Sequence, residues 1–166
     1  MLDSFEFLPD TLILSPLSCF SKKRLFEDVA DQAAFIIKTH AIDINMLLND
    51  REKCGSTALD NGVAIPHIQM NKIEKTFGIL SILQNKVFFN DVDTDLEDAD
   101  IVYTFFFSQQ DDPKDAEIFL KNICEIFENE DLCVSLRRAK NEPDTISTLL
   151  KKIDLQLGEL QQHAKD

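Results

Sequence analysis

The sequence predicts an α/β fold in which a mixed β-sheet is flanked by helices. Apolar residues recur at helical spacing in the N-terminal and C-terminal parts of the chain, while residues 62–107 hold runs rich in β-branched and aromatic side chains. The run at residues 100–107 is apolar enough for a central strand that is buried on both faces. Helices and strands interleaved in this order are typical of a mixed sheet with helices packed on it.

The first third of the chain predicts one strand and two helices. Residues 11–15 form an apolar run that is typical of a short buried strand. Ser21 is expected to cap an amphipathic helix that continues to about Lys38, because apolar residues follow it at helical spacing. Asp43 is expected to cap a second, shorter helix that ends near Gly55, since a glycine adopts a left-handed backbone without strain.

The middle of the chain predicts strands separated by polar turns. These strands are expected at residues 62–67, 76–83, 86–89 and 100–107. The acidic stretch at residues 90–100 lacks the glycine and the terminal glutamate of an EF-hand loop. It is therefore expected to be a solvated turn rather than a calcium site.

The C-terminal part predicts helices with recognisable starts. Asp112 followed by Pro113 begins one of them, because a proline at the first helical position gives up a donor that has no partner there. A break near Asn129 ends it, and Asp144 is expected to cap the last helix. The polar tail at residues 155–166 either extends that helix or frays.

Length and charge indicate a single soluble domain that binds neither nucleic acid nor membrane. A chain of 166 residues with 44% hydrophobic and 28% charged residues suits one globular core. Its net charge of −13 would repel the phosphates of a nucleic acid. No run approaches the roughly 20 apolar residues of a membrane span. An acidic surface suits a small basic protein partner, although it also serves solubility alone.

The cysteines and the N-terminus indicate a cytoplasmic protein. The four cysteines form no CxxC pair and have no histidine at ligand spacing, so they are expected to be reduced thiols. The apolar N-terminal piece has its basic cluster on the wrong side for a secretory signal. With no nucleotide-binding GxxxxGK[ST] loop and no cluster of metal ligands, neither a cofactor nor a metal is expected.

The residues that can carry chemistry lie between Arg51 and His67. His67 directly follows Pro66, which fixes its backbone at a predicted strand end where loops meet. A neutral imidazole is a competent nucleophile toward a phosphoryl group, because one nitrogen keeps a free lone pair. A structural or merely exposed histidine is the alternative. His40 and His163 have no partner motif and are expected at the surface.

An anion site is also indicated before His67. Arg51 offers a planar fork of donors that matches a phosphoryl group, while Gly55, Ser56 and Thr57 supply backbone donors and hydroxyls. The plain alternatives are a cation at a helix end and a polar turn.

The segment from Arg51 to His67 resembles the signature of the fructose/mannitol-type enzyme IIA domain of the bacterial phosphoenolpyruvate-dependent phosphotransferase system (PTS). The matching residues are Arg51, Glu52, Gly55, Ser56, Thr57, Gly62, Val63, Ala64, Ile65, Pro66 and His67. Residues 21–30 resemble the first helix of this family and residues 132–144 its C-terminal helical region. The resemblance thus covers about residues 8–153 of one domain expected at 1–166, with 154–166 as a tail.

The resemblance implies a mixed sheet flanked by helices and a phosphoryl group carried on the histidine. His67 would accept it from an HPr-type carrier or a nitrogen-branch homologue, and Arg51 would steady its oxygens. Ser56 and Thr57 would contribute donors around them. Positioning and charge stabilisation are sufficient for phosphoryl transfer, so no cofactor is implied.

The sequence departs from the family at several positions. Ala116, beside Glu117, replaces a second histidine that often helps to build the site. Glu117 could orient the ring of the active histidine, but it would also repel a phosphoryl group. Ala58 and Asp60 replace two glycines, and Ile68 replaces the glycine that usually follows the active histidine.

We therefore expect a stand-alone regulatory enzyme IIA of the nitrogen-branch kind, because no second phosphotransfer domain and no membrane segment share the chain. One alternative is a sugar-transport enzyme IIA that passes the phosphoryl group to an enzyme IIB. Another is a degenerate, non-catalytic module that signals by protein contact. A generic α/β domain with a coincidental motif is the third. The target, the oligomeric state and the modified nitrogen stay open.

Overall fold

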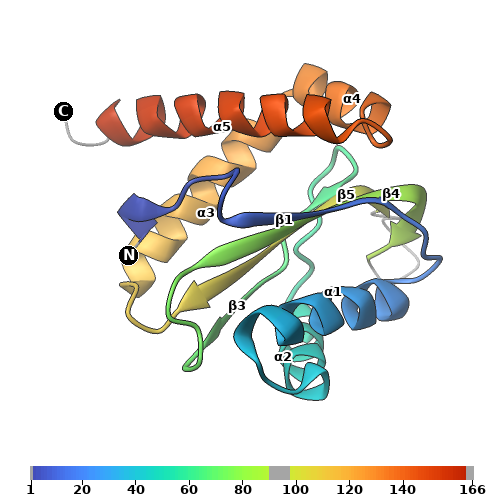
Figure 1. Cartoon of the computed structure of the whole chain (residues 1–166), viewed down its shortest axis with the longest axis vertical. Helices are drawn as coiled ribbons and strands as arrows, with labels where there is room; N and C mark the ends of the chain where they lie inside the picture. The colour runs from blue at the N-terminus through green and yellow to red at the C-terminus, as the bar shows by residue number, and fades with distance from the viewer. Residues whose placement is uncertain (1, 90–97, 164–166) are drawn as a thin grey trace.

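One mixed sheet lies between two layers of helices (Figure 1). The computed structural model describes residues 2–89 and 98–163. The sheet has five strands: β1 (Thr11–Leu17), β2 (Val63–Ala64), β3 (His67–Met70), β4 (Phe77–Phe88) and β5 (Asp98–Ser108). A mixed sheet flanked by helices is the predicted fold class, which is thereby confirmed.

The central strand of the sheet is β5. It pairs antiparallel with β4 on one side and parallel with both β2 and β3 on the other. β1 lies at the far edge, where it pairs parallel with β4. Every side chain of β5 from Ile101 to Ser108 is buried, as predicted for a strand covered on both faces.

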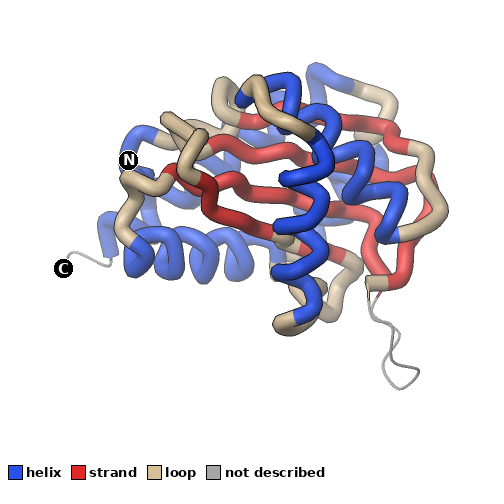
Figure 2. The backbone as a smooth tube through the Cα atoms, turned by 90° about the horizontal axis from the view of Figure 1, so that it is seen from below, coloured by secondary structure: helices blue, strands red, loops and turns tan. Residues whose placement is uncertain are grey.

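The helices form two layers. They are α1 (Lys22–Ile37), α2 (Ala41–Lys53), α3 (Pro113–Phe127), α4 (Glu130–Arg138) and α5 (Pro143–His163), after a short 3-10 turn, η1 (Leu2–Ser4). α1 and α2 cover one face of the sheet, and Figure 2 views the molecule from their side. α3, α4 and α5 cover the other face. In the described residues, no helix is long and apolar enough to cross a membrane.

Alternation along β5 divides the core between the two layers. Tyr103 and Phe105 face the layer of α3 to α5, where they stack with 4.4 Å between ring centroids. Val102 and Phe106 face α1 and α2. The period of two that characterises strands therefore gives each layer its own apolar cluster.

Several predicted element boundaries are confirmed. Ser21 caps α1 by accepting a hydrogen bond from the backbone N–H of Arg24, and Lys38 ends the helix in a left-handed conformation. Asp112 caps α3 with Pro113 at its first turn. The polar tail extends the last helix as far as residue 163.

Two predicted caps are wrong. His40 occupies the N-cap of α2, and Asp43, the predicted cap, lies in the first turn of that helix. Asp144 likewise lies in the first turn of α5, which begins at Pro143. A carboxylate stabilises the first turn through the helix dipole as well as at a cap, which explains both errors.

The strand predictions need one correction as well. Residues 76–83 and 86–89 were expected as separate strands, but β4 runs through both. The exposed residues 84–86 lie where the pairing register with β5 shifts, between Ile82 and Val87. These polar residues have the composition of a turn, but in the structure they form a β-bulge, in which the backbone stays extended. Of the acidic stretch at residues 90–100, residues 90–97 lie outside the described part, and the last three begin β5.

Gly78→Ala is expected to destabilise the fold by about 1–3 kcal/mol, because a buried ring leaves no room for a methyl group. A Cβ at position 78 would lie 2.5 Å from Cε1 of Tyr103. That ring is fully buried and stacked on Phe105, so it cannot move aside. Urea unfolding measures the loss. Gly158→Ala is the matched control: apart from the backbone of α5 and the two neighbouring residues, no atom lies within 4 Å of the added Cβ, so a gain of up to about 1 kcal/mol is expected.

Candidate functional site

The strand that leads to His67 is interrupted by a proline. β2 ends at Ala64 and β3 begins at His67, and both pair with β5 in one continuous register. Pro66 has no N–H to donate, but its carbonyl still accepts from the backbone N–H of Phe105 at 2.9 Å. His67 was expected at the end of a strand; it is instead the first residue of the strand that follows the break.

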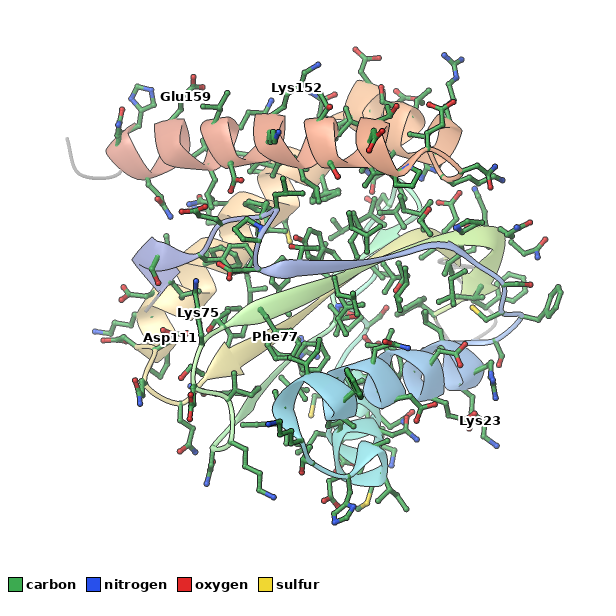
Figure 3. The ribbon with its side chains drawn as sticks, in the orientation of Figure 1. Lys23, Lys75, Phe77, Asp111, Lys152 and Glu159 are labelled. Carbon is green, nitrogen blue, oxygen red and sulfur yellow. The ribbon has the colours of Figure 1, made fainter. Side chains whose placement is uncertain are left out.

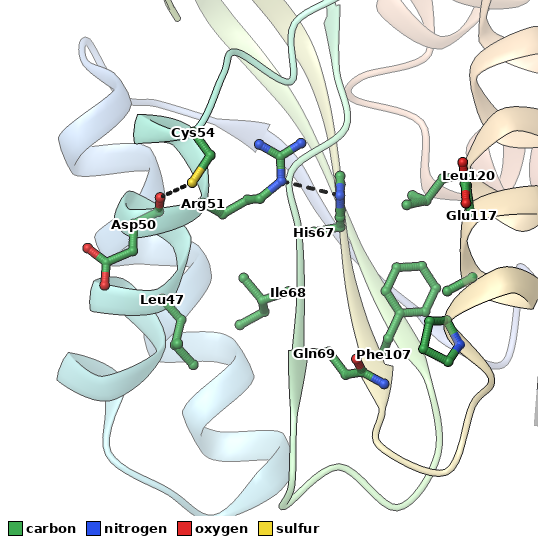
Figure 4. A pocket seen from close by; sticks show the side chains of 12 residues that line it. Leu47, Asp50, Arg51, Cys54, His67, Ile68, Gln69, Phe107, Glu117 and Leu120 are labelled. Atoms are coloured by element: carbon green, nitrogen blue, oxygen red, sulfur yellow. Dashed lines mark hydrogen bonds between the residues drawn. The ribbon is translucent and has the colours of Figure 1, made fainter.

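The ring of His67 is held at both nitrogens. Its Nδ1 lies 3.0 Å from the carbonyl oxygen of Ile65, which can only accept a hydrogen bond. Nδ1 therefore carries the proton, and Nε2 keeps its lone pair. Nε of Arg51 lies 3.4 Å from this Nε2 (Figure 4). The arrangement leaves Nε2 as the nucleophilic atom, beside a fixed positive charge.

Arg51 reaches this position from the last turn of α2. One terminal nitrogen of its guanidinium donates to the carbonyl of Gly55 at 3.0 Å, in the loop that follows the helix. A helix C-terminus favours a cation electrostatically, so the location itself stabilises the charge. The structure thus brings the two predicted principal residues, Arg51 and His67, into direct contact.

The surroundings keep His67 neutral at pH 7. Burial of the ring lowers its pKa below the ordinary value of 6.5, and the charge of Arg51 lowers it further. The hydrogen bond to the carbonyl of Ile65 acts in the opposite direction, but the net pKa remains lowered. A neutral imidazole is the form that can attack an electrophile.

A cavity of about 580 Å³ opens in front of His67 and Arg51. Residues of α2, β3, β5 and α3 line it: Leu47, Asp50, Arg51, Cys54, His67, Ile68, Gln69, Phe107, Pro113, Ala116, Glu117 and Leu120. Glu117 lies on α3, on the other side of the cavity from His67 (Figure 4). Ala116 therefore presents a methyl group where the resemblance implied a second histidine.

Ser56 and Thr57 lie differently from the expectation. The backbone N–H of Thr57 donates to the carboxylate of Glu52, at 3.3 and 3.4 Å from its two oxygens, and the Thr57 hydroxyl also donates to that carboxylate. The hydroxyl oxygen of Ser56 accepts from the backbone N–H of Ala58 at 3.2 Å. Neither residue lines the cavity. In the structure the donors of Thr57 bind Glu52, whereas the resemblance implied that they surround a phosphoryl group.

Sequence reasoning missed the apolar walls of the cavity. Leu47 lies on one side and Leu120 on the other, and Phe107 packs edge-on against His67 with 6.4 Å between ring centroids. The signal that could have found the first two is helical spacing: residues 47 and 51 share one face of α2, while 113, 116, 117 and 120 share one face of α3. Phe107 could be found only from the strand pairing.

Within the residues that the structure describes, no three or more histidine, cysteine, aspartate or glutamate side chains are grouped so as to hold a metal ion. All four cysteines are free thiols, as expected. Burial raises the pKa of the thiols of Cys19, Cys124 and Cys133.

Comparisons with known proteins point to one group. The sequence matches a family model, "Phosphoenolpyruvate-dependent sugar phosphotransferase system, EIIA 2", over residues 6–152. It is 29% identical over 137 residues to a nitrogen regulatory protein of Bradyrhizobium diazoefficiens, covering 82% of this chain and 88% of that relative.

Several solved structures share the fold, among them the following two. The nitrogen regulatory protein IIA-Ntr from Neisseria meningitidis matches with a TM-score of 0.74 and 23% identity, over 86% of this chain and 97% of that chain. A complex of enzyme IIA and phosphorylated enzyme IIB for mannitol from Escherichia coli matches with a TM-score of 0.65 and 15% identity, over 83% of this chain and 92% of that chain.

Proposed function

Because the chain belongs to the EIIA 2 family of the phosphoenolpyruvate-dependent sugar phosphotransferase system, we propose that it is a phosphocarrier that accepts a phosphoryl group on Nε2 of His67. One observation carries this proposal. The ring of His67 is held with its proton on Nδ1 and its lone pair on Nε2, at the wall of a cavity and beside Arg51. This is the geometry of an activated nucleophile with an adjacent cation.

The transfer needs little beyond alignment. The donor is a phosphohistidine of an HPr-type carrier protein. The lone pair of Nε2 forms the new N–P bond while the bond from phosphorus to the donor's nitrogen breaks, and that nitrogen keeps the electron pair. Nδ1 of His67 retains its proton on the Ile65 carbonyl, and the guanidinium of Arg51 stabilises the charge on the phosphoryl oxygens.

We infer a regulatory role of the nitrogen-branch kind. It rests on the similarity to the nitrogen regulatory proteins of Bradyrhizobium diazoefficiens and Neisseria meningitidis. The partners are then an HPr-type carrier and a regulatory target protein, and the protein acts in the cytoplasm, where phosphoenolpyruvate is made. We also propose that residues 1–166 form a single domain.

Two other roles have a specific observation behind each. The mannitol relative is described in complex with phosphorylated enzyme IIB, which favours transfer to an enzyme IIB. The methyl group of Ala116 at the cavity wall favours a module that no longer accepts phosphate and signals by contact. Glu117 on the same wall adds a negative charge that an incoming phosphoryl group would meet.

One experiment separates these roles. The protein is incubated with phosphoenolpyruvate, enzyme I and an HPr-type carrier, and its intact mass is followed, with and without a fructose-type or mannitol-type enzyme IIB. A stable gain of one acid-labile phosphoryl group supports the regulatory phosphocarrier. Rapid loss of that group to enzyme IIB contradicts the regulatory role, and no gain with any carrier favours the contact module.

The rate of phosphoryl acceptance is expected to fall as the pH is lowered, with a midpoint below pH 6.5. Protonation of Nε2 removes the attacking lone pair, and burial and Arg51 lower the pKa of His67 below 6.5. Initial rates with a pre-phosphorylated carrier measure the profile. Its midpoint should coincide with the midpoint of the His67 titration by NMR. A midpoint at or above pH 6.5 would contradict the lowered pKa.

A further inference from the structure

Glu52 is a buried carboxylate beside the site that the transfer step does not use. It follows Arg51 in the last turn of α2 and is 9% exposed. Burying a carboxylate is costly unless hydrogen bonds compensate for lost water, so its partners indicate what it does. Arg51 lines the cavity, whereas Glu52 contacts the loop that connects α2 to β2.

The contacts of Glu52 lead through two residues to the ring of His67. Both donors of Thr57, its backbone N–H and its hydroxyl, bind the Glu52 carboxylate. The carbonyl of Thr57 accepts from the backbone N–H of Ile65 at 3.0 Å. The carbonyl of Ile65 in turn accepts from Nδ1 of His67 at 3.0 Å. A single chain of hydrogen bonds therefore joins the carboxylate to the nucleophile.

The same loop also holds Arg51. The guanidinium donates to the carbonyl of Gly55, and the backbone N–H of Gly55 donates to the carbonyl of Glu52 at 3.1 Å. The loop is thus fixed at Gly55 by Arg51 and at Thr57 by Glu52. The position of this loop therefore determines where the guanidinium of Arg51 and the carbonyl of Ile65 lie relative to the ring of His67.

We propose that Glu52 is a positioning residue, which fixes the ring orientation and the Nδ1–H tautomer of His67 through Thr57 and Ile65. The inference rests on the proposed function, because it gives a role to Glu52 in keeping Nε2 free to accept a phosphoryl group. Loss of the carboxylate frees Thr57, the Ile65 peptide shifts, and the proton of the ring redistributes between the two nitrogens. Displacement of a reacting group by about 1 Å can lower a rate roughly 100-fold.

The decisive readout is the tautomer of His67 in the unphosphorylated protein, which long-range ¹H–¹⁵N NMR reports directly. In the wild type the Nδ1–H form should predominate. Glu52→Ala should give a mixture of tautomers and lower the rate of phosphoryl acceptance by about 10-fold to 100-fold. Glu52→Gln keeps an oxygen that accepts from the Thr57 N–H, so it should restore the tautomer and most of the rate. A purely structural role would leave the tautomer of the folded variant unchanged.

Glu159→Ala is the matched control, because Glu159 is an exposed glutamate on α5 whose side chain points away from the sheet (Figure 3). It should change neither readout. Circular dichroism at the temperature of the assay verifies that each variant is folded. Thr57→Val removes only the hydroxyl bond to Glu52 and keeps the backbone bond, so it should shift the tautomer in the same direction even if Glu52→Ala does not fold.

A wild-type tautomer in folded Glu52→Ala, or in Thr57→Val if the alanine variant is unfolded, would overturn the positioning role whatever the rate of phosphoryl acceptance. A wild type whose Nε2 carries the proton would overturn it as well. Failure of the proposed function is a distinct outcome. If no carrier phosphorylates the wild type, the tautomer measurement still decides whether Glu52 positions the ring.

Discussion

Replacement of His67 by alanine is expected to abolish phosphoryl acceptance completely, with no residual gain of mass in the presence of enzyme I, an HPr-type carrier and phosphoenolpyruvate. Among residues 2–89 and 98–163, only the Nε2 atom of His67 combines an unprotonated ring nitrogen, a cavity large enough for a phosphoryl group and an adjacent guanidinium. Without the imidazole no group at the site can attack the phosphorus atom, so the cavity and Arg51 cannot accelerate the transfer. Intact mass spectrometry after brief incubation measures the result.

The other two histidines of the chain are the matched controls for this experiment. His40 lies at the N-cap of α2 without a side-chain capping bond, and His163 ends α5. His40→Ala and His163→Ala should each accept one phosphoryl group at the wild-type rate. A full mass gain in His67→Ala, or its loss in either control, would show that the phosphoryl acceptor has been assigned to the wrong residue.

Arg51→Ala is expected to lower the rate of phosphoryl acceptance by about 100-fold to 1,000-fold, which is typical when one preorganised donor to a developing anion is removed. The guanidinium is held by the carbonyl of Gly55, and its Nε–H, which donates to Nε2 in the unphosphorylated protein, is released to the phosphoryl oxygens when the N–P bond forms. The variant should also raise the pKa of His67, because the charge of Arg51 contributes to lowering it. Rapid-quench kinetics and an NMR titration measure the two effects.

A second replacement tests whether the planar pair of donors of Arg51 contributes to the rate in addition to its charge. Arg51→Lys keeps the charge but loses the planar pair of donors, so an intermediate rate is expected. Lys53→Ala is the control: this exposed lysine belongs to the same turn of α2 and pairs with Asp50. It should leave the rate unchanged. A rate for Arg51→Ala within a few-fold of wild type would contradict a role for the guanidinium in the transfer step.

The resemblance to the enzyme IIA family is confirmed by the family match over residues 6–152. The fold was predictable because its signals are local. Ser21 and Asp112 cap their helices through bonds to residues three and two positions ahead, which the sequence alone specifies. The single strand β4 was not predictable, because the bulge between Ile82 and Val87 depends on its partner β5.

Prediction reached the principal residues of the site but not the residues that hold them. Arg51 and His67 stand out as residue types with their own chemistry, at a helix end and after a proline. The bonds from Thr57 to Glu52 could not be foreseen, because they depend on which side of the last turn of α2 faces the loop. In the sequence alone, a buried glutamate cannot be distinguished from an exposed one.

The loop before β2 has a further consequence for association between chains. The interrupted pair β2 and β3 forms one edge of the sheet, and an edge strand recruits a second chain through an unbroken row of backbone donors and acceptors. The carbonyl of Pro66 points to β5, whereas the backbone N–H of Ile65 points outward and donates to the carbonyl of Thr57. From the same loop, the backbone N–H of Leu59 donates to the carbonyl of Val63. The loop that leads to His67 thus also covers part of an open sheet edge and guards it against aggregation.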